Sequence, residues 1–107
     1  MIKHAEEPQE TMNCIDRLVQ EASKEITKSH IGIGHTRWAT CGEKVTRNAH
    51  PHFDKTKKVY IVHNGIIGGH SEIKKKYLDG VKFNSETDSE VAAQLIGKFK
   101  SEGASTL

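Results

Sequence analysis

The chain has 107 residues, 16 of them basic and 14 acidic, so its formal net charge at pH 7 is only +2. This length suits one domain or a piece of one. Aromatic residues make up 6% of the chain, whereas a nucleic-acid surface needs a basic stripe with aromatic partners, so we expect no nucleic-acid partner. Two cysteines are too few for a disulfide framework. No apolar run reaches the about 18 residues of a membrane span, and the polar N-terminus lacks a signal-peptide core, so the sequence predicts a cytoplasmic protein without a membrane partner.

The first half of the chain predicts one helix, one short strand and a long loop. Residues 1–10 show no apolar periodicity and are expected to fray. Apolar residues recur at steps of three and four over residues 11–29, which predicts a helix with Thr11 as a candidate N-cap. Alternation in residues 31–34 predicts a strand, and the aperiodic residues 37–53 predict a loop.

The second half opens with a strand signal. Residues 59–62 are β-branched and aromatic, which predicts a strand that ends at Asn64-Gly65. Residues 71–78 predict a short basic helix, and residues 81–83 predict another short strand.

The last element is a helix with a recognisable start. Thr87 and Glu90 have the spacing of a capping box, and the apolar pattern continues to Phe99. Residues 105–107 add no closing element, so we expect the sequence to be part of a larger domain.

Two charged residues are candidates for binding an amino acid. Arg37 follows the expected first strand, and a guanidinium binds a carboxylate through two parallel hydrogen bonds. Asp88 should be the first residue of the last helix, where the helix dipole favours a negative charge that could hold an ammonium group. Taken alone, each residue also suits an ordinary structural role, a surface salt bridge for Arg37 and helix capping for Asp88.

The Asn64-Gly65 pair has two interpretations. Asn-Gly is the commonest tight hairpin turn. Alternatively, the glycine lets a backbone N–H approach a reacting carbonyl while the asparagine amide supplies a second donor, so that together they stabilise an oxyanion.

Several histidines and a cysteine raise the question of a metal. The possible ligands are His35, Cys41, His50, His52 and His63. Their spacing matches no established zinc pattern, so we expect no metal site.

Four segments carry more information together than apart. In chain order they are His35–Thr40, Asn48–His52, Val62–Ile67 and Ser85–Glu90. This set closely resembles the glutaminase domain of the glutamine–fructose-6-phosphate aminotransferase family, over residues 12–107. Trp38 favours that family over the amidophosphoribosyltransferases, which usually have tyrosine at this place.

The resemblance implies a class II glutamine amidotransferase with the N-terminal-nucleophile hydrolase fold, an α+β protein built as an α-β-β-α sandwich. Residues 1–107 would form a partial domain of this type that lacks its first strands. No metal or organic cofactor is implied for the glutaminase step. The partners implied are glutamine and either a sugar-phosphate isomerase domain or an intact synthase.

The resemblance also implies roles for the residues that bind substrate. By position, Arg37 would hold the α-carboxylate of glutamine and Asp88 its α-ammonium group. Thr40 would line the pocket, and Trp38 would gate the passage of ammonia.

Asn64 and Gly65 would form the oxyanion hole, but the nucleophile of the family has no counterpart here. In the family a cysteine at the mature N-terminus attacks the glutamine side-chain amide, with its own α-amino group as the base. This chain begins Met1-Ile2-Lys3, and Cys14 lies mid-chain on the first predicted helix. Cys41 stands where the family usually has a glutamine-contacting histidine.

The sequence therefore predicts a fragment of the glutaminase domain that is inactive alone. Two alternatives stay open: a non-catalytic module that binds glutamine or pairs with a synthase, and a thiol enzyme that uses Cys41 activated by the charge of Arg37. Uncovered strands at residues 31–34 and 59–62 would also favour self-association of the chain.

Overall fold

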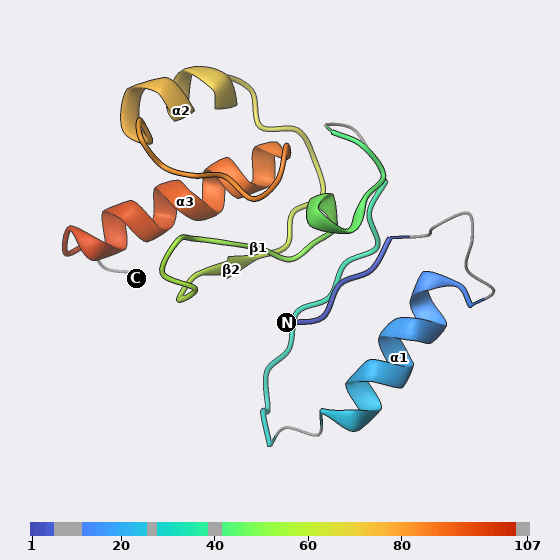
Figure 1. Ribbon diagram of the computed structural model, residues 1–107. Helices are drawn as coiled ribbons and strands as arrows, with labels where there is room; N and C mark the ends of the chain where they lie inside the picture. Colours follow the sequence, from blue (N-terminus) through green and yellow to red (C-terminus); the bar gives the residue numbers. More distant parts are fainter. Residues whose placement is uncertain (6–11, 26–27, 39–41, 105–107) are drawn as a thin grey trace.

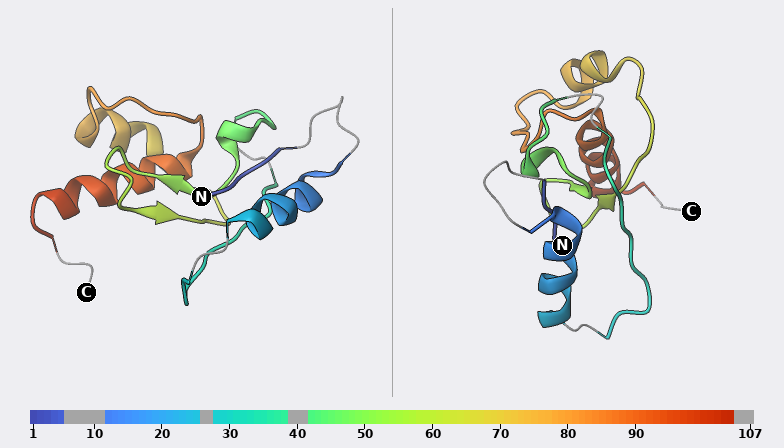
Figure 2. Two further views of the ribbon diagram at one scale, coloured as in Figure 1. Left: turned by 60° about the horizontal axis from the view of Figure 1, so that its bottom comes forward. Right: turned by 90° about the vertical axis from the view of Figure 1, so that its right-hand side faces the viewer.

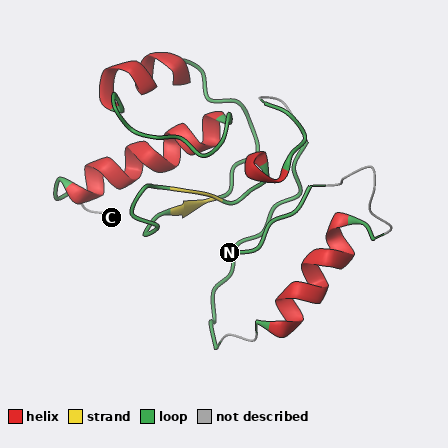
Figure 3. Ribbon diagram, in the orientation of Figure 1, coloured by secondary structure: helices red, strands yellow, loops and turns green. Residues whose placement is uncertain are grey.

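A computed structural model describes residues 1–5, 12–25, 28–38 and 42–104 (Figures 1 and 3). In chain order, the elements are α1 (Cys14–Lys24), the 3₁₀ turn η1 (Thr46–Asn48), β1 (His52–Phe53), β2 (Tyr60–Ile61), α2 (His70–Tyr77) and α3 (Asp88–Ser101). Helices predominate, and the two strands form one antiparallel sheet. Two facing sheets, as the sandwich requires, are not formed within these residues.

Helix α3 is the element on which α2 and the two strands pack, as Figure 1 shows. The sheet itself pairs His52 with Ile61 and Phe53 with Tyr60. Since α3 contacts every element of this half of the chain, its first turn is well placed to position side chains from several segments.

The start of α3 follows from its cap. Thr87 Oγ1 accepts a hydrogen bond from the backbone N–H of Glu90 at 3.3 Å, as predicted. The Glu90 carboxylate instead accepts the N–H groups of Asn84 and Ser85, at 2.8 and 2.6 Å. The capping box is therefore half formed, and Glu90 orders the segment that leads into the helix.

A hairpin turn closes the sheet at Asp54 rather than at Asn64-Gly65. Asp54 Oδ1 accepts the backbone N–H groups of Lys58 and Val59, each at 2.9 Å. The predicted strand over residues 59–62 is confirmed but is reduced to Tyr60–Ile61. The hairpin interpretation of Asn64-Gly65 is therefore wrong in this structure.

Two predicted strands are not formed. Residues 31–34 and 81–83 belong to no strand in the structure, and Ile31 and Ile33 are 88% and 52% exposed. A strand exists only beside a partner strand, and among the described residues neither segment pairs with one. The predicted loop over residues 37–53 is wrong in part, because η1 and β1 lie within it.

Helix α1 lies to one side of the other helices and strands (Figure 2), and its Glu21 Oε1 lies 3.1 Å from His4 Nε2 of the N-terminal segment. It begins at Cys14 after the N-cap Asn13 and ends at Lys24, shorter than predicted, while the proposed cap Thr11 lies outside the described residues. It packs against none of the other helices or strands, and Ile15 and Val19 are 50% and 59% exposed. The radius of gyration is 15.0 Å, above the about 13 Å of a compact domain of this length.

The first residues are tied to the segment before β1. Lys3 Nζ donates to the carbonyl oxygens of Arg47 and Ala49, at 3.2 and 3.1 Å, and Ala5 N donates to Thr46 Oγ1 at 3.2 Å. Residues 1–5 thus have defined contacts, although the whole stretch 1–10 is expected from the sequence to fray.

Candidate functional site

A cavity of about 400 Å³ lies beside the first turn of α3. Five residues singled out in the sequence line it together, namely Arg37, Trp38, Asn64, Gly65 and Asp88. They come from three segments that are far apart in the sequence. The remaining lining residues are His35, His50, His63, Ile66, Thr87 and Ser89.

Asp88 supplies a buried carboxylate to this cavity. It is the first residue of α3 and only 3% exposed. Its Oδ2 accepts a short hydrogen bond, 2.6 Å, from the backbone N–H of Ile67. Because the helix dipole is positive at this end, a negative charge here is favoured, and the carboxylate also holds the 63–67 segment against the helix.

Arg37 supplies the cationic side of the cavity. Its Nη1 donates to the carbonyl oxygen of Glu43 at 3.1 Å, so the side chain is directed by the loop that follows it. Trp38, the next residue, is 88% exposed and also lines the cavity. The two opposite charges of Arg37 and Asp88 thus border one cavity.

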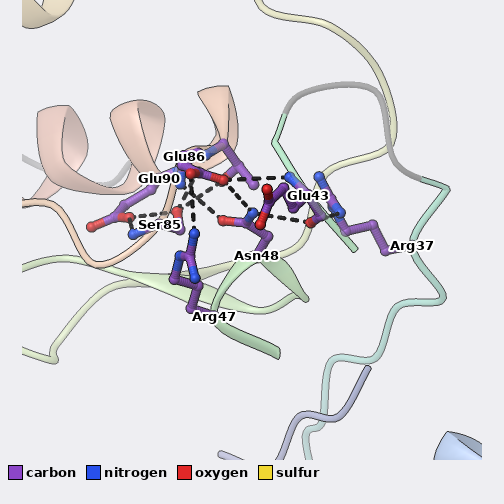
Figure 4. A network of polar contacts seen from close by, with 8 residues as sticks. Arg37, Glu43, Arg47, Asn48, Ser85, Glu86 and Glu90 are labelled. Atoms are coloured by element: carbon purple, nitrogen blue, oxygen red, sulfur yellow. Dashed lines mark hydrogen bonds and ion pairs between the residues drawn. The ribbon is translucent and has the colours of Figure 1, made fainter. Parts of the chain in front are cut away.

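A buried asparagine anchors the loop that directs Arg37 (Figure 4). Asn48 is fully buried, and its Nδ2 donates to the carbonyl oxygen of Glu43 at 3.0 Å and to Glu86 Oε2 at 2.8 Å. Its Oδ1 accepts the backbone N–H of Glu86 at 2.9 Å. Arg47 adds an ion pair to Glu86 at 3.0 Å.

The carboxylate of Glu86 is stabilised within this network. The hydrogen bond from Asn48, and then that from Arg47, lowers the pKa of Glu86 below its ordinary value. The network therefore joins the loop at residues 43–48 to the segment before α3, and it holds the Arg37 side of the cavity to the Asp88 side.

Gly65 occupies a position where a side chain would not fit. Its φ is +156°, and a Cβ added there would lie 3.1 Å from His63 Nε2. Few residues other than glycine adopt this conformation. Asn64 and Gly65 both line the cavity.

Three histidines form a contiguous wall beneath the cavity. The ring of His35 stacks on His50 with centroids 4.0 Å apart, and His50 meets His52 edge to face at 4.6 Å. His52 Nε2 lies 3.0 Å from Thr87 Oγ1, so the wall reaches the cap of α3.

His50 and His52 favour the neutral form. Burial, followed by the positive field of His52, His35 and Arg37, lowers the pKa of His50 to about 4. Burial, followed by the charge of Lys3, lowers the pKa of His52 to about 4. Within the part of the chain that the structure describes, no group of three or more His, Cys, Asp or Glu residues could hold a metal ion.

Two of the candidate residues cannot be placed. Thr40, expected to line the pocket, and Cys41, the candidate thiol, lie outside the described residues. The sequence alone indicates no role for Ser89 or Ile66, and for Thr87 it indicates only a role as the cap of the last helix. The positions of these residues in the motifs were the available signal. Each is adjacent to Asp88 or Gly65, and adjacent residues lie near the same cavity.

Comparison with known proteins now decides the family. The model of the glutamine amidotransferase domain family matches residues 4–107. The chain belongs to this family. The match covers nearly the whole sequence, including all the segments that line the cavity.

Curated relatives of the chain carry the name glutamine–fructose-6-phosphate aminotransferase. The chain is 60% identical to a glutamine–fructose-6-phosphate aminotransferase (isomerizing) of Fusobacterium nucleatum over 69 residues, 64% of this chain and 11% of that protein. It is 53% identical to the Streptococcus pneumoniae enzyme over 77 residues, 71% of this chain and 13% of that protein. The enzyme of Halalkalibacterium halodurans is 46% identical over 87 residues, 81% of this chain and 14% of that protein. The matched part of the chain therefore spans a small fraction of the length of these relatives.

A helix that spans a membrane must be both long and apolar. Over the described ranges, no helix is both long and apolar enough to pass through a lipid bilayer.

Proposed function

We propose that the cavity binds the α-amino and α-carboxylate groups of glutamine, and that the chain is a piece of the glutaminase domain of a glutamine–fructose-6-phosphate aminotransferase. The observation that carries the proposal is the convergence of Arg37, Trp38, Asn64, Gly65 and Asp88 on one cavity. The family match and the relatives support the choice of glutamine.

The chemistry of the cavity suits a zwitterion. A guanidinium holds a carboxylate through paired hydrogen bonds, which assigns the α-carboxylate to Arg37. A buried carboxylate at a helix N-terminus holds an ammonium group, which assigns the α-ammonium to Asp88. Burial keeps His50 and His52 neutral, so these two side chains add no charge near the cavity at neutral pH.

The remaining roles complete the proposal. Asn64 and Gly65 would donate hydrogen bonds to the oxygen of the side-chain amide as it becomes an oxyanion, each donor contributing about 3 kcal/mol to a reaction of this kind. Thr40 would contact glutamine, and Trp38 would gate the release of ammonia toward a sugar-phosphate isomerase domain. The parent reaction would convert fructose 6-phosphate and glutamine to glucosamine 6-phosphate and glutamate.

Turnover requires a nucleophile as well as a pocket. A polypeptide of the printed 107 residues starts with methionine and carries no N-terminal cysteine. Covalent catalysis without its nucleophile loses most of its rate, so we propose that this polypeptide binds glutamine without hydrolysing it. Glutamate release that disappears in Cys41→Ala would contradict this and would support a thiol enzyme.

Binding is tested by titrating the 15N-labelled chain with L-glutamine and following the amide signals of Gly65 and Ile67. Arg37→Lys keeps the charge but loses the paired geometry, so it should weaken binding at least about 10-fold. Arg17→Lys is the matched control, because Arg17 lies on the remote helix α1. The proposal fails if the chain does not bind L-glutamine, or if both variants bind it equally well.

A further inference from the structure

The segment from His63 to Ile67 is attached to the first turn of α3 at two points. His63 Nδ1 lies 3.2 Å from Ser89 Oγ, and Ile67 N donates to Asp88 Oδ2 at 2.6 Å. Gly65 lies between these two attachments. Ser89 is only 2% exposed, so water does not compete well for its hydroxyl group.

Gly65 rests against the ring of His63. A Cβ on Gly65 would lie 3.1 Å from Nε2 and 3.3 Å from Cε1 of that ring, so the ring lies close beside Gly65 and would have to shift by a few tenths of an ångström to admit a side chain there. The position of the ring therefore limits the position of the Gly65 backbone. The hydrogen bond to Ser89 fixes the ring in turn, so a continuous chain of contacts runs from α3 to Gly65.

We propose that His63 and Ser89 are positioning residues whose hydrogen bond fixes the Gly65 side of the cavity relative to Asp88. The inference rests on the proposed function in one respect, namely that the cavity holds an amino acid. Asp88 would take the α-ammonium group and Gly65 the side-chain amide, so their separation must match the length of the ligand. A binding group held loosely by about 1 Å loses much of its effect.

The first test needs no ligand. Ser89→Ala removes the hydrogen bond, and His63→Leu removes it while keeping a bulky side chain. His63→Asn keeps a polar atom near the place of Nδ1 and should restore the bond. Ser71→Ala, at an exposed serine in α2, is the matched control.

The readouts are amide hydrogen exchange at Ile67 and the amide chemical shift of Gly65. We expect Ile67 to exchange about 3- to 10-fold faster in Ser89→Ala and His63→Leu, as the loss of one hydrogen bond implies. The Gly65 signal should move in the same variants. His63→Asn and Ser71→Ala should resemble the wild type, and exchange at Gly97 within α3 should be unchanged throughout.

Two results would overturn the proposal. One is an unchanged amide exchange rate at Ile67 together with an unchanged Gly65 chemical shift in Ser89→Ala. The other is equal acceleration at Ile67 and Gly97, which would mean that Ser89 only supports the whole fold.

A second test separates this inference from the proposed function. L-Glutamine should bind about 3- to 10-fold more weakly to Ser89→Ala, whereas L-2-aminobutyrate, which has no side-chain amide, should bind equally to both proteins. If Ser89→Ala binds glutamine as tightly as the wild type while Arg37→Lys does not, the positioning role is wrong and the proposed function stands. If the wild type binds no glutamine, the proposed function is wrong, and the exchange and shift measurements still decide the positioning role.

Discussion

Asn48 shows how a single polar residue can organise this molecule. It is fully buried and makes three hydrogen bonds that join the loop at Glu43 to the residue before the cap of α3. Removing a buried partner leaves the other groups unsatisfied, which costs about 1–3 kcal/mol. Asn48→Ala should therefore lower the free energy of unfolding by about 2–3 kcal/mol, measured by urea denaturation.

The matched variant for this prediction is Asn13→Ala. Asn13 also uses its side chain to bond a backbone N–H, but it caps α1, which packs against no other element. It should leave the urea midpoint of the remaining fold unchanged. Equal losses in the two variants would mean that Asn48 has no special role.

The lowered pKa values of His50 and His52 determine how the stability of the fold depends on pH. Their pKa values in the fold are about 4, below the ordinary 6.5, so the unfolded chain binds protons that the folded chain rejects. Stability is therefore complete above about pH 6.5 and falls progressively as the pH drops to about 4, by on the order of 1–3 kcal/mol for each histidine.

Urea unfolding at pH 7.5 and pH 5.0 checks this prediction. The wild type should be less stable at pH 5.0, and His52→Gln should show a smaller difference between the two pH values. Equal stability of the wild type at both pH values would contradict the burial of neutral His50 and His52.

At the scale of elements, α3 depends on a glycine in its own interior. Alanine is normally better than glycine in a helix by about 1 kcal/mol. A Cβ at Gly97, however, would lie 2.5 Å from Asp54 Cβ and 2.6 Å from its Oδ2, and Asp54 organises the hairpin turn. Overpacking of this kind costs about 1–3 kcal/mol.

Gly97→Ala should therefore lower the melting temperature despite its better helix propensity. Gly68→Ala is the control, because nothing lies within 4 Å of a Cβ at Gly68. A melting temperature that rises in Gly97→Ala would show that α3 and the hairpin do not pack as described.

The elements that the sequence predicts well are those with local causes. The cap at Thr87 and the apolar pattern after it locate α3, and the basic helix at residues 71–78 appears as α2, one residue earlier at each end. Residues 31–34 and 81–83 alternate like strands but lack a partner in this structure. Strand formation depends on distant residues, so alternation alone could not predict the outcome.

The residues of the cavity likewise divide into those that local motifs identify and those that depend on distant contacts. Arg37, Asn64, Gly65 and Asp88 could be selected from motifs, and the structure brings them to one cavity. The contact between His63 and Ser89 joins residues 26 positions apart. No local pattern encodes such a contact, because it depends on how residues 63–67 pass the first turn of α3.

At the scale of the whole molecule, the described fold buries little apolar surface. Among the described residues, the buried hydrophobic ones are only Leu78, Val91 and Ala93, while large apolar side chains such as Ile31 and Val19 are exposed. Each strand of the two-stranded sheet is paired along one edge only. Such surfaces favour association.

We therefore predict a chain that is marginally stable alone or that associates with itself. Its melting temperature should change with protein concentration, and sedimentation should detect species larger than the 11.9 kDa monomer. A monomer with a sharp, concentration-independent melt at about 45–65 °C would show instead that the chain is self-sufficient.

We propose above that Arg37 and Asp88 hold the two α-groups of one amino acid. The most direct measurement compares L-glutamine, D-glutamine and glutarate in titrations of the 15N-labelled chain. Two fixed charges together with the Asn64-Gly65 backbone define a handed site, so L-glutamine should bind at least about 10-fold more tightly than the other two. Asp88→Asn, which can still accept the Ile67 N–H, should abolish that preference. Equal binding of the three ligands, or an unchanged preference in Asp88→Asn, would contradict the assignment of the two α-groups to Arg37 and Asp88.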